Sequence, residues 1–371
     1  MRPPTRCLLT SPRSPRPPPC WPANETPPLG PASGRRLAAE KIGNQLGFRD
    51  PSGTVSTYST NGALDTGNPF FQSMGTNGRT CASCHLAGDA FGLSATSAQV
   101  RFAASGGTDR LFAAVDGANC PSAAPSDAAA RSLLLNNGLI RVFLLVPASA
   151  QFTVEAVHDP YGCALVADPQ GAQIVSVYPR PLPTTNLSFL SAVMFDGRET
   201  SAPLTNAGTF LANLRTDLAH QAMDATLGQA QAAAAPSDAT LAQIVDFELA
   251  LFTAQETDDA ADILNAEGAN GGPGALADQG FYPGINDPLG GNPTGAAFDP
   301  VSITIYTPWL SLPSSDNGRY KGAREAVARG EALFDTHPVA ITDVTRLIAA
   351  SRFELPLLGS NQDSPDPEGA S

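Results

Sequence analysis

The sequence lacks, near its start, the long apolar run that a membrane span or a secretory signal peptide needs. Residues 1–36 contain eleven prolines and six arginines, and their longest apolar run is Leu8-Leu9. Such a segment cannot bury enough apolar surface to fold. We therefore expect a disordered Pro/Arg-rich leader over residues 1–36, with no integral membrane segment. Arg35-Arg36 is a poor twin-arginine signal because no apolar stretch follows it.

Basic residues are also few. The 371 residues carry 22 lysines and arginines against 35 acidic side chains, which gives a formal charge of −13. This balance argues against nucleic acid or an anionic membrane as a partner, and it favours a basic protein instead. The hydrophobic content of 42% is nevertheless enough for real cores.

Cysteine is scarce and forms one close pair, Cys81 and Cys84. A zinc site would need a second close pair of ligands, and Cys120 and Cys163 each stand alone. A thioredoxin-type pair would follow a buried strand, whereas Gly75-Thr76-Asn77-Gly78-Arg79 indicates a loop before Cys81. Both of these sites are therefore disfavoured.

The stretch Thr80-Cys81-Ala82-Ser83-Cys84-His85 contains the Cys-x-x-Cys-His pattern of c-type haem attachment. Two thiols at this spacing match the vinyl groups on one porphyrin edge, and the adjacent His85 is placed to ligate the iron as the proximal ligand. The sequence thus predicts one covalent haem c at Cys81, Cys84 and His85. Phe91, Val100 and Phe102 are candidate apolar contacts or ordinary core residues.

Cys120 and Cys163 lie among turn-forming residues. In an exported protein we expect a disulfide between them, and two separate buried thiols are the alternative. His158, in a nearby turn, is expected to be a solvent-exposed side chain rather than an iron ligand.

The hydrophobic pattern predicts helices over residues 37–47, 127–135, 209–221 and 239–254, the last with a cap at Ser237 or Asp238. Alternating or β-branched runs predict strands over 139–146, 152–157 and 174–178. The polar Ser/Thr/Gly stretch up to Asn68 is assigned neither helix nor strand. We therefore expect a mainly α, cytochrome c-like haem domain with long loops and a small antiparallel β insertion at about 139–178.

Four segments resemble, in order, the bacterial di-haem cytochrome c peroxidases and the related di-haem enzyme of methylamine utilisation. They are residues 68–86 with the haem motif, 186–199 with Phe195-Asp196-Gly197-Arg198, 239–254, and 322–334. The resemblance implies a first haem domain over 37–264, a Gly/Pro-rich linker loop over 265–300, and a partial second cytochrome c-like domain over 301–371. No cysteine follows Cys163, so the second domain is expected to be truncated and to lack its haem motif.

The resemblance also implies roles for individual residues. Cys81 and Cys84 would form the thioethers, Arg198 would hold a haem propionate or else be a solvated surface residue, and Phe195 would replace the family's usual tryptophan. Independently of the resemblance, Met194 is a candidate sixth iron ligand, as are Met74, His220 and Met223. An open sixth site is one alternative, and each of the four is otherwise an ordinary core or surface residue. The linker's Asp and Asn side chains are candidate calcium ligands, although no Asp-x-Asp-x-Asp-Gly spacing occurs.

The function expected from these observations is haem-dependent electron transfer in the periplasm, with a redox protein or a small molecule as electron donor. Reduction of hydrogen peroxide by a cytochrome c peroxidase-like oxidoreductase is the enzymatic form of this expectation. However, the family usually has a Glu-Met dipeptide after this motif, and its glutamate is the acid–base residue of the peroxide site. No such dipeptide is visible after Asp196-Gly197-Arg198. A single-haem electron carrier, an inactive remnant and a haem-free thiol protein remain as alternatives.

Overall fold

The computed structural model describes residues 41–44, 46–120, 127–156, 159–161, 173–201, 210–281, 285–286, 292, 295–313 and 318–337. All of them belong to one of the two compact units into which the chain divides, Ala39–Ser371. The predicted leader over residues 1–36 lies outside the described residues, and so does everything after His337.

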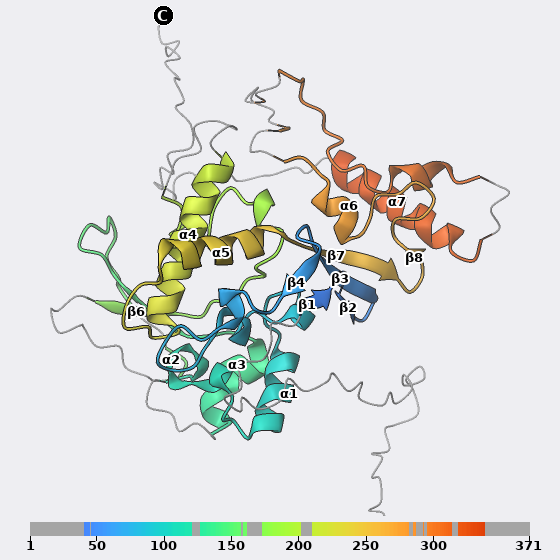
Figure 1. Ribbon diagram of the computed structural model, residues 1–371. Helices are drawn as coiled ribbons and strands as arrows, with labels where there is room; N and C mark the ends of the chain where they lie inside the picture. The colour runs from blue at the N-terminus through green and yellow to red at the C-terminus, as the bar shows by residue number, and fades with distance from the viewer. Residues whose placement is uncertain are drawn as a thin grey trace, which may run out of the picture. The chain divides into compact units, whose positions relative to one another are not determined.

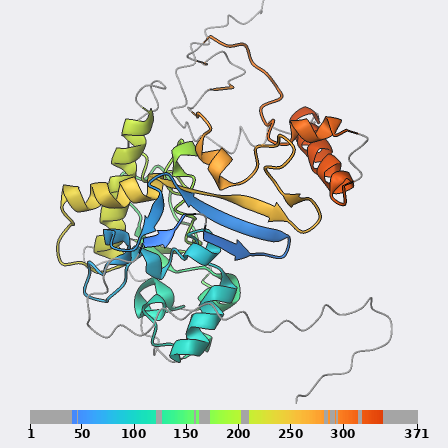
Figure 2. The same cartoon turned by 45° about the vertical axis from the view of Figure 1, so that its right-hand side comes forward.

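The largest sheet has four antiparallel strands in the order β2 (Leu46–Arg49), β3 (Gly53–Ser59), β7 (Leu251–Asp258) and β8 (Asp262–Ile263), as Figures 1 and 2 show. The β2–β3 hairpin turns at Asp50, whose carboxylate accepts hydrogen bonds from the backbone N–H groups of Ser52 (2.8 Å) and Gly53 (2.7 Å). The β3–β7 pair instead joins two strands that lie far apart in the sequence. Inside this pair the buried hydroxyls of Thr57 and Thr253 bond at 2.7 Å.

Two smaller antiparallel pairs accompany this sheet. Strand β1 (Lys41–Gly43) pairs with β4 (Ala63–Asp65), and β5 (Val142–Leu145) pairs with β6 (Ile174–Val177). The second pair confirms the antiparallel insertion predicted over 139–178, but with two strands. Residues 152–156 form no strand, and Val157 lies outside the described residues.

Helices make up most of the remaining regular structure. They are α1 (Ala95–Ser105), α2 (Ala114–Gly117), α3 (Ser132–Asn137), α4 (Phe210–Gly228), α5 (Asp238–Leu249), α6 (Pro273–Ala277) and α7 (Lys321–Thr336). Helix α5 starts at one of the two predicted caps, since the Ser237 hydroxyl accepts a hydrogen bond from the backbone N–H of Thr240. None of the described helices combines the length with the apolar character that crossing a membrane requires.

The expected mainly α fold is wrong, because the described residues mix these helices with the four-stranded sheet and two strand pairs. The helix predicted over 37–47 is contradicted by β1 and β2. The helix predicted to continue to residue 254 ends at Leu249, and Leu251 begins β7. The physical reason is tertiary, since residues 251–254 pair with 56–59 of β3 and these backbone bonds outweigh the local helical pattern.

Two of the apolar cores draw residues from both α4 and α5, which pack against each other. The motif core, so named because Cys81 packs against it, contains Leu64, Phe70, Phe91, Ala222, Leu241, Ile244, Phe247 and Leu251. The second core contains Leu187, Val193, Phe210, Leu214, Leu218 and Val245. Helix α7 packs elsewhere, with Ala328 against the fully buried Trp309.

Candidate functional site

The Cys-x-x-Cys-His residues are held on a single tight turn of backbone, the 3₁₀ turn Cys81–Ser83, which we call the motif turn. The carbonyl of Cys81 accepts hydrogen bonds from the N–H groups of Cys84 (3.1 Å) and His85 (3.0 Å). At its start, the backbone N–H of Thr80 donates to the Ser83 hydroxyl at 3.0 Å. Cys81 and Cys84 are both free thiols and both half-buried. The turn thus presents two reduced sulfurs and an imidazole from neighbouring positions.

A backbone carbonyl fixes the orientation of the His85 ring. Its Nδ1–H donates to the carbonyl oxygen of Phe91 at 3.0 Å. The chain returns to this position because Ala90 and Phe91 both adopt left-handed backbone (φ 55° and 57°), and Leu86 bonds across the loop to Gly92 at 2.8 Å. With Nδ1 occupied, Nε2 is the nitrogen that can bind a metal.

Burial also favours the neutral form of this imidazole. It lowers the pKa of His85 below its ordinary value, against backbone hydrogen bonds at Phe91 and Leu182 that raise it. A neutral ring is the form that ligates a metal. The site therefore holds His85 in a protonation state and tautomer suited to coordination through Nε2.

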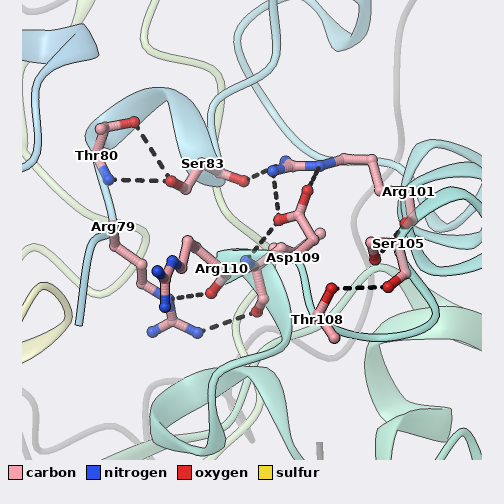
Figure 3. Close-up of polar contacts among 9 residues, drawn as sticks. Arg79, Thr80, Ser83, Arg101, Ser105, Thr108, Asp109 and Arg110 are labelled. Carbon is pink, nitrogen blue, oxygen red and sulfur yellow. Dashed lines mark hydrogen bonds and ion pairs between the residues drawn. The ribbon is translucent and has the colours of Figure 1, made fainter. Parts of the chain in front are cut away.

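Two arginines anchor the motif turn (Figure 3). Arg79, directly before Thr80, is almost completely buried and its guanidinium donates to backbone carbonyls of Arg110 (2.9 Å) and Leu111 (3.0 Å). It also reaches the carbonyls of Ala113 and Gln229, each at 3.3 Å. A guanidinium has five donors and can satisfy several carbonyls at once, so this side chain ties the start of the motif turn to two separate stretches of chain.

Arg101 of α1 contacts the other end of the motif turn. Its guanidinium donates to the Ser83 carbonyl at 2.6 Å and forms a two-pronged ion pair with Asp109, with N–O distances of 2.9 and 2.6 Å (Figure 3). Asp109 in turn accepts a hydrogen bond from the backbone N–H of Leu111 at 2.8 Å. Charge-assisted bonds of this kind have well-defined geometry, so both ends of the turn are fixed.

Aromatic rings form an apolar wall beside the turn. Phe70 lies 6.3 Å from the His85 ring and 5.0 Å from Phe247, measured between ring centroids. Phe71 and Phe91 contact Phe247 at 5.3 and 6.1 Å. Phe91 is thus a core residue, as one of the two predictions for it allowed. Of the other two candidate contacts, Phe102 packs against Phe112 at 5.0 Å and Val100 is exposed.

A carboxyl group is buried against this apolar wall. Glu248 is only 4% exposed, and its Oε2 has no hydrogen-bond partner in the described part of the chain. Burial raises the pKa of Glu248 to about 8. The pKa of Cys81 is raised to about 12, mainly by burial and secondly by the negative charge of Glu248. Burial also raises the pKa of Cys84.

The candidate sixth ligands lie in two different places. Met194 has a left-handed backbone (φ 67°) and packs against the second core, on residues such as Val193. Met74 and Met223 pack against the motif core, to which Cys81 also belongs. The structure therefore groups these two methionines, rather than Met194, with the motif turn.

The Asp-Gly-Arg segment forms an exposed turn. Arg198 pairs with Asp196 at 2.8 Å and lies 3.9 Å from Glu199, while Phe195 is 97% exposed. His220, another candidate ligand, donates from Nδ1 to Glu199 at 2.7 Å, and this bond raises the pKa of His220. Together with Asp224, these two side chains form a cluster of metal-ligating type, which lies outside the 265–300 segment where calcium was predicted.

Only one cysteine of the predicted disulfide lies among the described residues. Cys120 is disulfide-bonded, which contradicts the alternative of a free buried thiol at this position. Its expected partner, Cys163, lies outside the described residues, as does His158.

Sequence reasoning missed the two arginine anchors and treated Glu248 as one more residue of a packing helix. A charged residue within the apolar spacing of Leu241, Ile244 and Val245 is a pattern that could have identified Glu248. Arg79 had no comparable pattern, because its partners are backbone carbonyls that any sequence supplies.

No family model, no curated protein and no solved structure matches this chain.

Proposed function

We propose that this chain is a c-type haem protein of the periplasm that transfers electrons, with one haem bound covalently by Cys81 and Cys84 and ligated by Nε2 of His85. The observation that carries the proposal is the bond from His85 Nδ1 to the Phe91 carbonyl, next to two free thiols on the motif turn. It leaves the remaining imidazole nitrogen for iron, and it is the outer hydrogen bond that haem-ligating histidines commonly make.

The residues present fit such a group in their chemistry. The donor set is two thiols and one neutral imidazole, and the aromatic rings of Phe70, Phe91 and Phe247 supply an apolar wall beside it. When bound, the haem supplies a one-electron couple. Arg79 and Arg101 would hold the three attachment residues in their relative positions, because they donate to backbone carbonyls at both ends of the motif turn.

Burial of the thiols disfavours the alternative of a haem-free thiol enzyme. A thiol with its pKa raised to about 12 stays protonated at neutral pH, and the thiolate is the nucleophile in disulfide exchange. A redox-active thiol pair would need the opposite shift. The donor set therefore supports haem attachment over thiol–disulfide chemistry.

The net charge of −13 suits a basic redox protein as the electron donor, because opposite charges speed diffusional encounter. Association should then weaken with increasing ionic strength. The choice between electron transfer and peroxide reduction depends on whether peroxide reaches the iron. Met74 and Met223 pack against the motif core, and either of them, bound as the sixth ligand, would keep peroxide from the iron.

The deciding experiment is a pyridine haemochrome spectrum of the full chain, expressed with an added signal peptide and a haem-maturation system. We expect one covalent haem in the wild type and none in a Cys81→Ala/Cys84→Ala variant. His85→Ala should keep the thioether spectrum in pyridine, while the absorption spectrum of the native protein, recorded without pyridine, should lose the features of histidine ligation. Absence of covalent haem in the wild type would refute the proposal. Rapid reoxidation of the reduced protein by hydrogen peroxide would assign peroxidase activity, and inertness would assign an electron carrier.

A further inference from the structure

Glu248 combines deep burial with an unpaired oxygen, and neither stability nor the haem-binding role above explains this. Its side chain lies on α5 in the apolar stripe that includes Ile244 and Phe247, and its Oε2 accepts no hydrogen bond within the described residues. Burying a carboxyl group without full hydrogen bonding costs free energy. A methionine would fill a similar volume with no polar group to desolvate, so the carboxyl group itself calls for a function.

The position of Glu248 links it to the motif turn. Phe247 and Leu251, on either side of Glu248 in the sequence, belong to the motif core, and Cys81 packs against the same core. The charge of Glu248 acts on the Cys81 sulfur. That sulfur is the atom that would join the porphyrin edge, so a charge on Glu248 would be felt at the macrocycle through protein rather than through water.

In the described part of the chain, the segments that pack most extensively against α5 place no unpaired cation against this carboxyl group. They are α4, β7 and the 3₁₀ turns Pro69–Phe71 and Leu187–Phe189, and the two turns contain no ionisable side chain. The ionisable residues of α4 lie in other interactions: Arg215 pairs with Asp246, Asp217 with Ser201, and His220 with Glu199. Asp224 lies in the same cluster as His220 and Glu199.

The acidic residues of β7 also form hydrogen bonds with other groups. Glu256 bonds the Ser56 hydroxyl, and Asp258 accepts from the backbone N–H groups of Ala260 and Ala261, each at 2.8 Å. On α5 itself, Asp238 lies in the first turn and Asp246 pairs with Arg215. The thiol of Cys81 remains as the titratable group that interacts with Glu248. Arg79 and Arg101 act on the Cys84 sulfur, but a guanidinium keeps its charge at all relevant pH values. Glu248 is therefore the group acting on Cys81 that can change its charge when the charge at the haem changes.

We propose that Glu248 is the site of proton uptake coupled to reduction of the haem, an inference that rests on the proposed function. In the step, a one-electron outer-sphere donor would be oxidised, its electron would reduce the ferric iron of the bound haem to ferrous iron, and the Glu248 carboxylate would take up one hydrated proton from the buffered solvent. The added negative charge is thereby neutralised inside the protein. Oxidation reverses the step and releases the proton. In a low-dielectric site this compensation favours coupled over uncoupled transfer.

The experiment measures the midpoint potential of the full-length haem-loaded protein between about pH 6 and pH 10. For the wild type we expect the one-electron equilibrium to shift with pH by up to about tenfold per pH unit, which is ~59 mV. Glu248→Gln should remove this slope. Asp246→Asn is the matched control, because it deletes a carboxylate two residues away on the exposed face of α5 and should keep the slope.

A second measurement compares redox-difference infrared spectra of the wild type and Glu248→Gln. The wild-type spectra should show a protonated carboxyl band that grows on reduction, and this band should be missing in Glu248→Gln. Covalent haem with a pH-independent potential, or with equal slopes in the wild type and Glu248→Gln, would overturn this inference and leave the proposed function standing. Failure to attach haem in the wild type would overturn both.

Discussion

Replacement of Arg79 by methionine should cost far more stability than its single position on a loop suggests. The side chain is 3% exposed and donates to four backbone carbonyls, and its Nη1 lies 3.8 Å from the carboxylate of Asp116. Methionine keeps much of the apolar stem but leaves the carbonyls and a buried carboxylate without their donor. Losing one partner of a buried ion pair costs ~3–5 kcal/mol, and we expect about 4 kcal/mol here, a large fraction of a typical folding free energy of roughly 5–15 kcal/mol.

The size of this loss should depend on pH through Asp116. Burial raises the pKa of Asp116 from 3.8 to about 6, and Arg79 acts in the opposite direction. Without Arg79 the folded-state pKa rises further, so the folded protein holds a proton that the unfolded chain has released. Stability then falls as pH rises from about 4 to about 7, by ~1.4 kcal/mol for each unit of added pKa shift. Below about pH 4 both states are protonated and this part of the loss vanishes.

Urea denaturation of the wild type, Arg79→Met and Arg79→Met/Asp116→Asn at pH 4.5 and 7 measures these effects. The double variant should recover part of the loss at pH 7 and lose the added pH dependence. Arg110→Met, an exposed neighbour, is the control and should change the unfolding free energy by less than about 0.5 kcal/mol. A loss below about 1 kcal/mol for Arg79→Met, or one that does not change with pH, would refute the reasoning.

Three further predictions concern other supports of the same region. Burial raises the pKa of Glu248 from 4.5 to about 8, so wild-type stability should fall as pH rises from about 4.5 to about 8, whereas Glu248→Gln should avoid about 5 kcal/mol of this decline in urea denaturation. Asp109→Asn breaks the ion pair that holds Arg101 on the Ser83 carbonyl, and it should cost ~1–2 kcal/mol and speed amide exchange in the motif turn. Cys120→Ser removes a disulfide and should cost ~2–4 kcal/mol, a loss that reduction of the wild type should reproduce.

The elements that the sequence predicted well are those with a strong local pattern. Helix α4, the Ser237 cap of α5 and the β5–β6 pair all follow from periodicity or capping residues. Strand β3 could not be predicted in this way. It contains Gly53-Thr54-Val55-Ser56-Thr57-Tyr58-Ser59, with no apolar alternation, and it buries Ser56, Thr57 and Ser59 against a partner strand almost two hundred residues away.

The candidate site likewise contains residues that the sequence predicts and residues that it does not. The motif residues Cys81, Cys84 and His85 are adjacent in sequence, so their spacing alone predicted them. The groups that fix them are supplied by distant segments through backbone atoms, as in the bonds of Arg79 to the carbonyls of Leu111 and Gln229. Backbone carbonyls carry no sequence signature, so such anchors appear only in the folded chain.

The pairing of β3 with β7 also sets the order of events during biosynthesis. Residues 251–258 emerge roughly 170 positions after the motif turn, which at ~5–20 residues per second corresponds to on the order of ten seconds or more. Until these residues have been synthesised, β3 has no β7 partner and the four-stranded sheet is incomplete. The core against which Cys81 packs includes Phe247 and Leu251, so the surroundings of this sulfur in the folded chain cannot form before that point.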